Sequence, residues 1–508
     1  MAASRSTKLL LFAVFTRVCF IVLQIFVNNL IPDHQADAFH QSTLLNPTTG
    51  DTIISFLLDG FTKWDAAYFL HIAEEGYTHQ HMFAFFPLFP TLVRILAYTV
   101  LYPLQYLMHI RSVLIFSSVL INFCAFPVCA HVLFKLGCYV LGDGQMAYRA
   151  ALFFCINPAG VFMSAAYTET LFSMLSFAGM LKLEQGRYMS SAALFALSGA
   201  TRSNGLVSLG FVLYGSVKAV VMRFTTVVRT RSRTAIASLY GIFLYRAAVV
   251  ILSTGIVILP FLLFQFYAYM TICVEYKLVP DFIKQYLQTG AVKQTLALDP
   301  SWCEGALPIP YSMIQSQHWE VGFLQYYEVK QIPNFFLALP MIILCICATI
   351  DYCSNRRSYV KLLGLTSSGI MIKYDKSFKE PTFRFYDDCV FVYVVHMVFL
   401  TLFGVTCMHV QVITRFLASS CPVIYWYTAW LTSDLSHRPP QPPTVKEDQT
   451  ATTSSKVNEL SELVLHNVLT MQIRNWQSLN ETTKIVFRYF FLYNILGLIL
   501  HCNFLPWT

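Results

Sequence analysis

Long apolar segments separated by shorter polar ones dominate the chain, and this pattern predicts membrane-spanning helices. A run of about 20 apolar residues is long enough to cross a bilayer as a helix. Single spans are predicted at about 9–31, 86–108, 112–138, 247–269, 334–352, 389–409 and 485–503. We therefore expect an all-α polytopic membrane protein, with residues 1–508 in one domain of about nine to eleven transmembrane helices.

Two further apolar regions, 147–181 and 189–217, are each too long for one ordinary span and contain polar interruptions. The first holds Asn157-Pro158, and the second holds ATRSNG with Arg202. Such breaks are tolerated in a membrane where the backbone lines a cavity. Burying an unpaired arginine is costly, so we expect Arg202 at a functional site. The alternative is that Arg202 ends a helix and reaches out to the membrane interface.

Basic residues indicate how the chain is oriented. Arg5 and Lys8 precede the first apolar run, which we interpret as a retained signal anchor with a cytosolic N-terminus. The basic stretches are also expected in the cytosol, at 218–246 and 353–387. The segments expected on the opposite, lumenal side are 32–85, 274–333 and 432–484, the last of them partly disordered because it is rich in Pro, Ser and Thr.

A glycosylation sequon, Asn480-Glu481-Thr482, lies in the last of these segments. We expect Asn480 to be glycosylated on the side that carries Asp65. The final span would then return the C-terminus to the cytosol.

Composition agrees with a membrane protein. Hydrophobic residues make up 56% of the chain and charged residues 12%, against about a quarter charged in a soluble domain. The net charge of +8 reports membrane orientation and does not indicate a nucleic-acid partner. The 14 cysteines lie mostly in apolar segments without zinc-site spacing. Cys303 is the main candidate for a disulfide, and the sequence leaves its partner open.

The segment 61–90 carries more chemistry than a simple connection between helices needs. If Trp64 opens a helix, one face carries Asp65, Tyr68, Phe69 and Ile72. That helix would lie at the membrane surface with its apolar side down. Asp65 would sit in the first turn, where the helix dipole favours a carboxylate, and it is our candidate general base. In the alternative, Asp65 only caps the helix and the aromatic residues form an interfacial belt.

Other polar and aromatic residues predict binding of a lipid-linked substrate on the same side. Arg202 and Arg415 could each hold a phosphate through paired hydrogen bonds. The aromatic stretch from Trp319 to Tyr327 offers stacking surfaces for sugars; alternatively, it belongs to a cap that only stabilises the spans. There is no glycine-rich phosphate loop, and the Asp387-Asp388 pair is expected in the cytosol. A lipid-phosphate sugar donor without a metal therefore fits better than a nucleotide sugar.

Several long motifs resemble the PIG-V family of mannosyltransferases, in the same order and over nearly the whole chain from about residue 60. They are KWDAAYFLHIAEEGY, FAFFPLFP, NPAGVFMSAAYTETLFS, ATRSNG, WEVGFLQYYEVKQIPNF, HVQVITRF and LHCNFLPWT. The regions 353–387 and 432–480 match poorly.

This resemblance implies a GT-C-type, inverting glycosyltransferase of the endoplasmic reticulum, with lumenal loops forming the active site. The family transfers the second mannose, in α-1,6 linkage, from dolichol-phosphate mannose to the one-mannose glycosylphosphatidylinositol (GPI) precursor. Asp65 matches the expected base. The substrate-binding residues expected from these motifs are Trp64, Arg202, Asn204, Trp319, Tyr326, Gln331, Asn334 and Arg415. No cofactor is implied, and a small membrane partner subunit is suggested by analogy with yeast-type systems.

Two other functions are compatible with the residues alone. A transporter or lipid scramblase would use broken helices such as those at Asn157-Pro158 and Arg202, although the chain shows no obvious pair of repeated halves. A non-catalytic membrane scaffold would not require Asp65 beside an aromatic loop. Accumulation of a one-mannose glycolipid in cells lacking the protein would distinguish the transferase from both.

Overall fold

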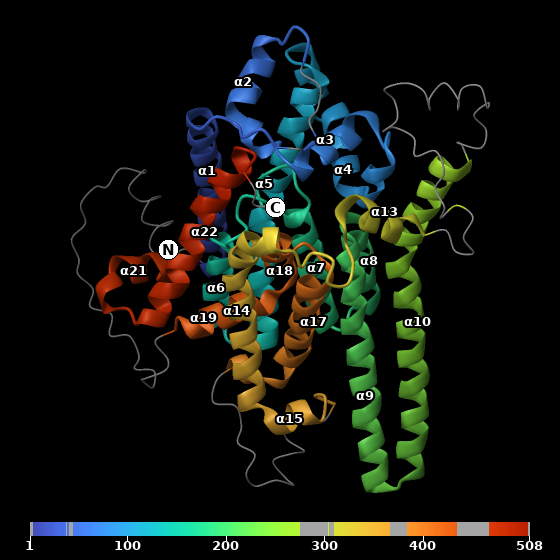
Figure 1. Cartoon of the computed structure of the whole chain (residues 1–508). Helices are drawn as coiled ribbons and strands as arrows, with labels where there is room; N and C mark the ends of the chain where they lie inside the picture. Colours follow the sequence, from blue (N-terminus) through green and yellow to red (C-terminus); the bar gives the residue numbers. More distant parts are fainter. Residues whose placement is uncertain are drawn as a thin grey trace.

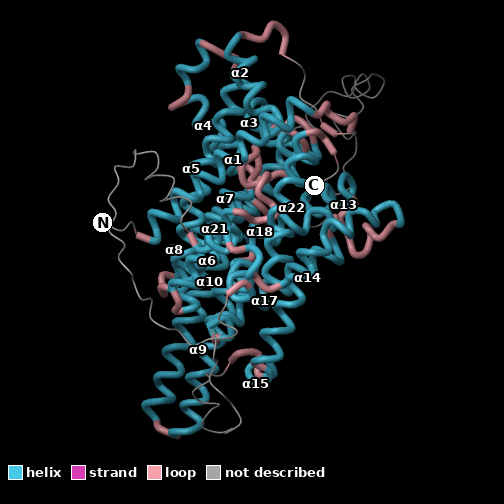
Figure 2. Tube along the Cα trace, turned by 90° about the vertical axis from the view of Figure 1, so that its left-hand side faces the viewer, coloured by secondary structure: helices cyan, strands magenta, loops and turns pink. Residues whose placement is uncertain are grey.

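The computed structural model describes residues 4–36, 38–39, 44–274, 303, 309–365, 384–433 and 467–505. Within these ranges the regular elements are helices, and no strand is found among them (Figure 2). The expectation of an all-α protein is confirmed. Much of the predicted 274–333 loop and residues 434–466 of the predicted disordered segment lie outside the described residues.

The helices fall into an N-terminal, a central and a C-terminal set (Figure 1). The N-terminal set is α1 Arg5–Leu30, α2 Thr49–Leu58, α3 Asp65–Glu75, α4 Leu88–Tyr98, α5 Ile110–Leu141, α6 Gly144–Cys155 and α7 Glu169–Glu184. The central set is α8 Tyr188–Thr201, α9 Leu209–Thr230, α10 Arg233–Tyr269, α13 Pro310–Trp319, α14 Ile332–Asn355 and α15 Arg357–Lys361. The C-terminal set is α17 Phe391–Cys407, α18 Ile413–Ser420, α19 Pro422–Leu431, α21 Val468–Arg474 and α22 Glu481–Cys502.

Seven helical segments of the described chain are long and apolar enough to cross a membrane. They are Arg5–Leu30, Ile110–Leu141, Ser203–Thr230, Arg233–Val274, Val329–Asn355, Asp388–Cys407 and Glu481–Cys502. The predicted span at 86–108 is not one helix: α4 has 11 residues and is followed by a short 3-10 turn, Tyr102–Tyr106. The predicted 218–246 loop is instead the helical tip of the α9–α10 hairpin, because α9 continues to Thr230 and α10 begins at Arg233.

The predicted breaks at Asn157-Pro158 and at Arg202 are confirmed. Residues 156–168 connect α6 to α7 without regular helix, and Arg202 is the residue at which α8 ends. The carbonyl groups freed by the first break need donors inside the membrane. Buried Arg17 of α1 supplies two, bonding Gly160 O at 2.8 Å and Cys155 O at 3.1 Å. The irregular segment is therefore tied to α1.

Helix α22 runs in the same direction as α1, which corrects the predicted side of the C-terminal region. Phe20 of α1 and Asn494 of α22 both lie against Gly160, and Gln24 and Cys502 both lie against Gly60. The start of α22 at Asn480 is therefore at the end of the bundle where α1 begins. The prediction that Asn480 and residues 468–484 share the side of Asp65 is wrong, and the turn after α22 lies beside Trp64 rather than on the opposite face.

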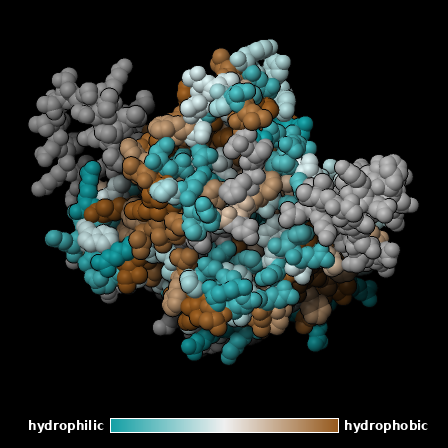
Figure 3. Space-filling model, turned by 45° about the horizontal axis from the view of Figure 1, so that its top comes forward, coloured by the Kyte–Doolittle hydropathy of each residue, from teal (hydrophilic) through white to brown (hydrophobic). Residues whose placement is uncertain are grey.

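The described parts of the basic segments, residues 218–246, 353–365 and 384–387, lie at the end of the molecule opposite Asp65, as predicted. Arg356 at the end of α14 pairs with Asp388, and the tip of the α9–α10 hairpin projects beyond α15 (Figure 1). The other end carries α2, α3 and α4, and hydrophilic side chains gather there beside apolar patches (Figure 3). Because basic residues favour the cytosol, we expect the first residues of α1 and α22 on the cytosolic side.

This orientation predicts how the chain is glycosylated. Asn480→Gln should leave its electrophoretic mobility unchanged, because the sequon would face the cytosol. Pro47→Ser converts Asn46-Pro47-Thr48 into an acceptor sequence near α2, and this variant should gain one glycan that endoglycosidase removes. A glycan on Asn480 of the wild-type chain would reverse the orientation of α22.

Candidate functional site

Four charged side chains form a continuous row where the breaks in the helices meet. Asp65 Oδ2 accepts a hydrogen bond from Arg415 Nη2 at 2.7 Å. Arg415 Nη1 donates to Glu169 Oε1 at 3.2 Å. Arg202 Nη1 pairs with the same Glu169 oxygen and donates to Thr168 Oγ1 at 3.3 Å. The row alternates in sign and carries no net charge.

Helix ends explain why the charges can be held there. Asp65 and Glu169 are the first residues of α3 and α7, where the positive end of the helix dipole favours a carboxylate. Arg202 follows the last residue of α8, where the negative end favours a cation. Arg415 lies in the first turn of α18, where the helix dipole does not favour a cation. Its two carboxylate partners stabilise its charge instead.

Exposure differs along the row. The Glu169 side chain is 0% exposed, Arg415 10%, Arg202 17% and Asp65 24%. Asp65 is therefore the carboxylate that a bound substrate can reach. Arg202 is the more accessible arginine, and the ion pairs described here join it to one carboxylate, whereas Arg415 is joined to two.

The structure separates the two interpretations of Asp65. Its helix begins at Asp65, as predicted, but the N-cap residue is Trp64, which makes no side-chain cap hydrogen bond. The Asp65 carboxylate turns to Arg415 instead of capping α3. The prediction of a helix lying on the membrane is wrong, because the apolar face of α3 packs on α4 and α5 and buries Phe69 and Ile72 in the protein.

Arg202 does not end α8 as a free side chain reaching outward, as the alternative interpretation required. Its guanidinium pairs with buried Glu169 inside the protein. Nearby, Asn204 Nδ2 donates to Ser420 Oγ at 3.0 Å, which places this predicted residue beside α18. Sequence reasoning missed Glu169 as a site residue. The available signal was the acid within YTET, residues 167–170, in a long apolar segment, where an ionisable residue is expensive unless it is paired.

Aromatic rings cover the row next to Asp65. Tyr68, one turn after Asp65, is stacked between Phe39 and Phe85, each at a centroid distance of 4.7 Å. Trp319 of α13 packs edge-on against Tyr68 at 6.3 Å and Phe85 at 5.6 Å. The predicted association of the Trp319 segment with the Asp65 loop is thus confirmed. The disulfide Cys273–Cys303 supplies the partner that the sequence left open.

Histidines at the edge of this aromatic cover add little positive charge at neutral pH. Burial, together with the neighbouring imidazoles of His79, His318 and His71, lowers the pKa of His81 to about 4. Burial also lowers the pKa of His318. The aromatic cover is therefore a mostly neutral surface, suited to sugar rings more than to anions.

Three predicted binding residues form a second polar group. Asn334 Nδ2 donates to Tyr326 Oη at 2.8 Å and to Gln331 Oε1 at 2.7 Å. Tyr326 stacks on His409 at 4.5 Å, and the His409 imidazole contacts the carbonyl of Trp319. Burial lowers the pKa of His409, while Trp319 O, Glu320 and Asp65 oppose that shift. His409 thus joins this group to Trp319, which packs in the aromatic cover next to Asp65.

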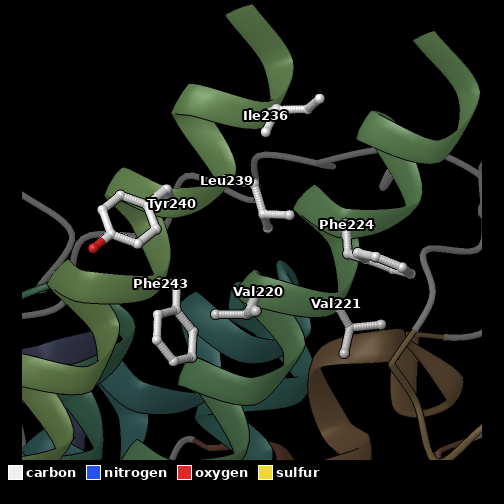
Figure 4. Close-up of a pocket in the computed structure, with 7 residues that line it drawn as sticks. All are labelled: Val220, Val221, Phe224, Ile236, Leu239, Tyr240 and Phe243. Atoms are coloured by element: carbon white, nitrogen blue, oxygen red, sulfur yellow. The ribbon is translucent and has the colours of Figure 1, made fainter. Parts of the chain in front are cut away.

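A hollow with an apolar lining lies elsewhere in the described residues. A cavity of about 400 Å³ lies between α9 and α10 near the hairpin tip (Figure 4). Its lining residues are Val220, Val221, Phe224, Ile236, Leu239, Tyr240 and Phe243. It offers no charged group to a phosphate and stands far from the Asp65 row, so we assign it no part in the site.

The chain is similar to characterised mannosyltransferases along its length. It is 40% identical to "GPI alpha-1,6-mannosyltransferase 2" of Cricetulus griseus over 505 residues, which are 99% of this chain and 98% of the relative. The Homo sapiens protein of the same name is 39% identical with the same coverage. "GPI mannosyltransferase 2" of Drosophila melanogaster is 33% identical over 82% of this chain and 89% of the relative.

A solved structure also aligns, with a weaker likeness. The archaeal oligosaccharyltransferase AglB from Archaeoglobus fulgidus is 8% identical, with a TM-score of 0.41 over 98% of this chain. The alignment covers 56% of AglB, so this chain spans little more than half of its length. A TM-score at this level does not establish a shared fold.

The model of the family described as "Mannosyltransferase (PIG-V)" matches residues 6–508. That match contains every residue of the Asp65–Arg415–Glu169–Arg202 row and the second polar group around Tyr326. The chain is a multi-pass membrane protein that belongs to the PIG-V mannosyltransferase family.

Proposed function

We propose that this protein is an α-1,6-mannosyltransferase that adds the second mannose to the GPI precursor in the endoplasmic reticulum. The donor is dolichol-phosphate mannose and the acceptor is the one-mannose glycolipid. The names of the relatives that match nearly the whole chain support this assignment. The observation that carries it is the row in which an accessible carboxylate, Asp65, stands at one end and an accessible arginine, Arg202, at the other.

In this proposal Asp65 is the general base. It takes the proton from the attacking mannose hydroxyl while that oxygen bonds to the anomeric carbon of the donor mannose. The bond between that carbon and the phosphate oxygen breaks, and its electron pair leaves with dolichyl phosphate. Attack opposite the leaving group converts the β-linked donor into the α-linked product, as an inverting GT-C-type enzyme would.

Arg202 is proposed to hold the departing phosphate. A guanidinium presents paired donors to phosphate oxygens and stabilises the charge that develops as the bond breaks. Arg415 was an equal candidate on sequence grounds. Its bonds to two carboxylates favour a role in orienting Asp65. A metal is not needed in this scheme, because the leaving group is a lipid monophosphate and not a diphosphate.

The remaining predicted residues are proposed to bind sugars and lipid at the lumenal membrane surface. Trp64, Trp319 and Asn204 surround the row, while the group of Tyr326, Gln331 and Asn334 offers amide and aromatic contacts to the acceptor glycan. A small membrane partner subunit remains part of the proposal by analogy.

Loss of the protein tests this function. Cells lacking it should accumulate the one-mannose glycolipid, and the wild-type chain should clear that intermediate. A transporter or scramblase would change lipid flux without that block. Normal two-mannose glycolipid in the deleted cells would reject the proposal.

Arg202→Lys should lower kcat/KM for the donor by about tenfold to a hundredfold. Lysine keeps the charge but loses the planar fork, and a charge-assisted hydrogen bond contributes about 1.5–3 kcal/mol. The measurement is mannose transfer at varied donor concentration, normalised to folded protein. Arg187→Lys, at the exposed start of α8, is the matched control and should be silent. Unchanged transfer by Arg202→Ala would remove Arg202 from the site.

A further inference from the structure

Trp64, the residue before the proposed base, has an unusual backbone conformation. Its φ is 59° and its ψ is −130°, a region that non-glycine residues rarely occupy. Such strain persists only where the surrounding structure enforces it, and it is concentrated at functional sites. The direction of the Asp65 side chain depends on this one residue, because a different Trp64 conformation would rotate the start of α3.

The turn after α22 lies directly against this strained residue. The rings of Trp64 and Phe504 are 5.7 Å apart, and the ammonium group of Lys63 lies 4.9 Å from the centre of the Phe504 ring. Phe504 is itself at positive φ, 54°. Two strained residues from distant parts of the chain thus face each other.

Several contacts fix the turn in place. Leu505 N donates to Leu500 O at 2.8 Å, and His34 N donates to Asn503 O at 2.9 Å. At Gly60, an added Cβ atom would stand only 3.0 Å from Cys502. The backbone before Asp65 therefore approaches α22 so closely that any side chain at position 60 would be crowded. The turn is a firm support for that loop.

The backbone amide of Asp65 is also held in place through residues packed on the end of α22. Asp65 N donates to the hydroxyl of Tyr167 at 3.1 Å, and the Tyr167 ring packs against buried His501 at 5.4 Å. Asp65 therefore has three attachments: its carboxylate to Arg415, its amide to Tyr167, and its preceding residue to Phe504.

We propose that Phe504 is a positioning residue for catalysis: it holds Trp64 in its strained conformation and so directs the Asp65 carboxylate at the acceptor hydroxyl. The inference rests on the proposed role of Asp65 as base. Phe504 does not touch the substrates in this account. It acts through the geometry of Trp64 and Asp65, and its loss should slow the chemical step more than it weakens binding.

Phe504→Ala should lower kcat about tenfold to a hundredfold with KM changed less than about threefold, because a displacement of about 1 Å at a reacting group can cost 10²-fold in rate. Phe504→Tyr keeps the ring and should retain most activity. Phe504→Leu provides an intermediate variant should the alanine chain fold poorly. Phe491→Ala is the matched control, since Phe491 lies on the exposed side of α22, the helix that precedes the turn with Phe504; it should leave both constants unchanged.

The decisive measurement is a double-mutant cycle, with radiolabelled mannose transfer normalised to monodisperse protein. If Phe504 acts through Asp65, Phe504→Ala should cost less than about threefold in an Asp65→Asn background, because coupled residues are not additive. The full loss in both backgrounds, or an equal fall in kcat for Phe504→Ala and Phe504→Tyr, would overturn the inference while leaving the role of Asp65 intact. Near-normal transfer by Asp65→Asn alone would instead reject the proposed base.

Discussion

Asp65→Asn is expected to lower mannose transfer by about 10²–10⁴-fold, which is the usual contribution of a general base. Asparagine keeps the size of the side chain and can still accept a hydrogen bond from Arg415, but it cannot take a proton. The fold should survive, because Arg415 remains paired with Glu169. The measurement is transfer to the one-mannose glycolipid in membranes, with the level of folded protein controlled.

A helix-capping role for Asp65 predicts the opposite outcome. Asparagine is as good a cap as aspartate, so the substitution would then be nearly silent. Asp59→Asn is a suitable control, because Asp59 is a nearby carboxylate on the same loop that pairs with Lys63 instead of an arginine of the row. Near-normal transfer by Asp65→Asn would move the search for a base to Glu74, Glu75 and Glu320.

Glu169→Ala is expected to destabilise the protein and abolish transfer. Glu169 is fully buried and pairs with both Arg202 and Arg415. Removing one partner of a buried ion pair costs about 3–5 kcal/mol, because the remaining charge is uncompensated. The amount of monodisperse protein and its melting temperature in detergent should both fall. Glu481→Ala, at a 72% exposed position, should change neither.

Charge balance distinguishes this explanation from a simple packing defect. Glu169→Gln leaves an excess positive charge, whereas Glu169→Gln combined with Arg202→Gln restores neutrality. We expect the double variant to melt at a higher temperature than Glu169→Gln alone, although it should remain inactive. Wild-type stability and transfer in Glu169→Ala would contradict the central place given to this residue.

The sequence located the parts of the site that have local signals. Asp65 could be identified because it follows Trp64 at a predicted helix start, ahead of a recognisable aromatic run. Arg202 could be identified because an arginine in an apolar segment requires an explanation. Glu169 was missed because its importance lies in tertiary contacts. Its two arginine partners are 33 and 246 residues away along the chain, and no spacing rule connects them.

The predicted orientation of the last helix was wrong for a different physical reason. Helices α6, α7 and α8 have 12, 16 and 14 residues, fewer than a full span needs. Hydropathy alone does not show how many times such short helices cross the membrane. One miscounted crossing reverses the predicted side of every later segment. Arg474 precedes α22, and Lys484 and Arg488 lie within its first eight residues; these charges agree with a cytosolic start. The sequon at Asn480 led to the opposite prediction, because a glycosylated asparagine must face the lumen.

Transfer by the purified chain tests the central claim most directly. The full-length protein would be reconstituted in liposomes with dolichol-phosphate mannose labelled in its sugar and the one-mannose glycolipid as acceptor. The account predicts a labelled two-mannose glycolipid whose new residue is released by an α-1,6-specific mannosidase, and about 10²–10⁴-fold slower formation of it by the Asp65→Asn chain. Equal product from both chains, or a new mannose in another linkage, would contradict it.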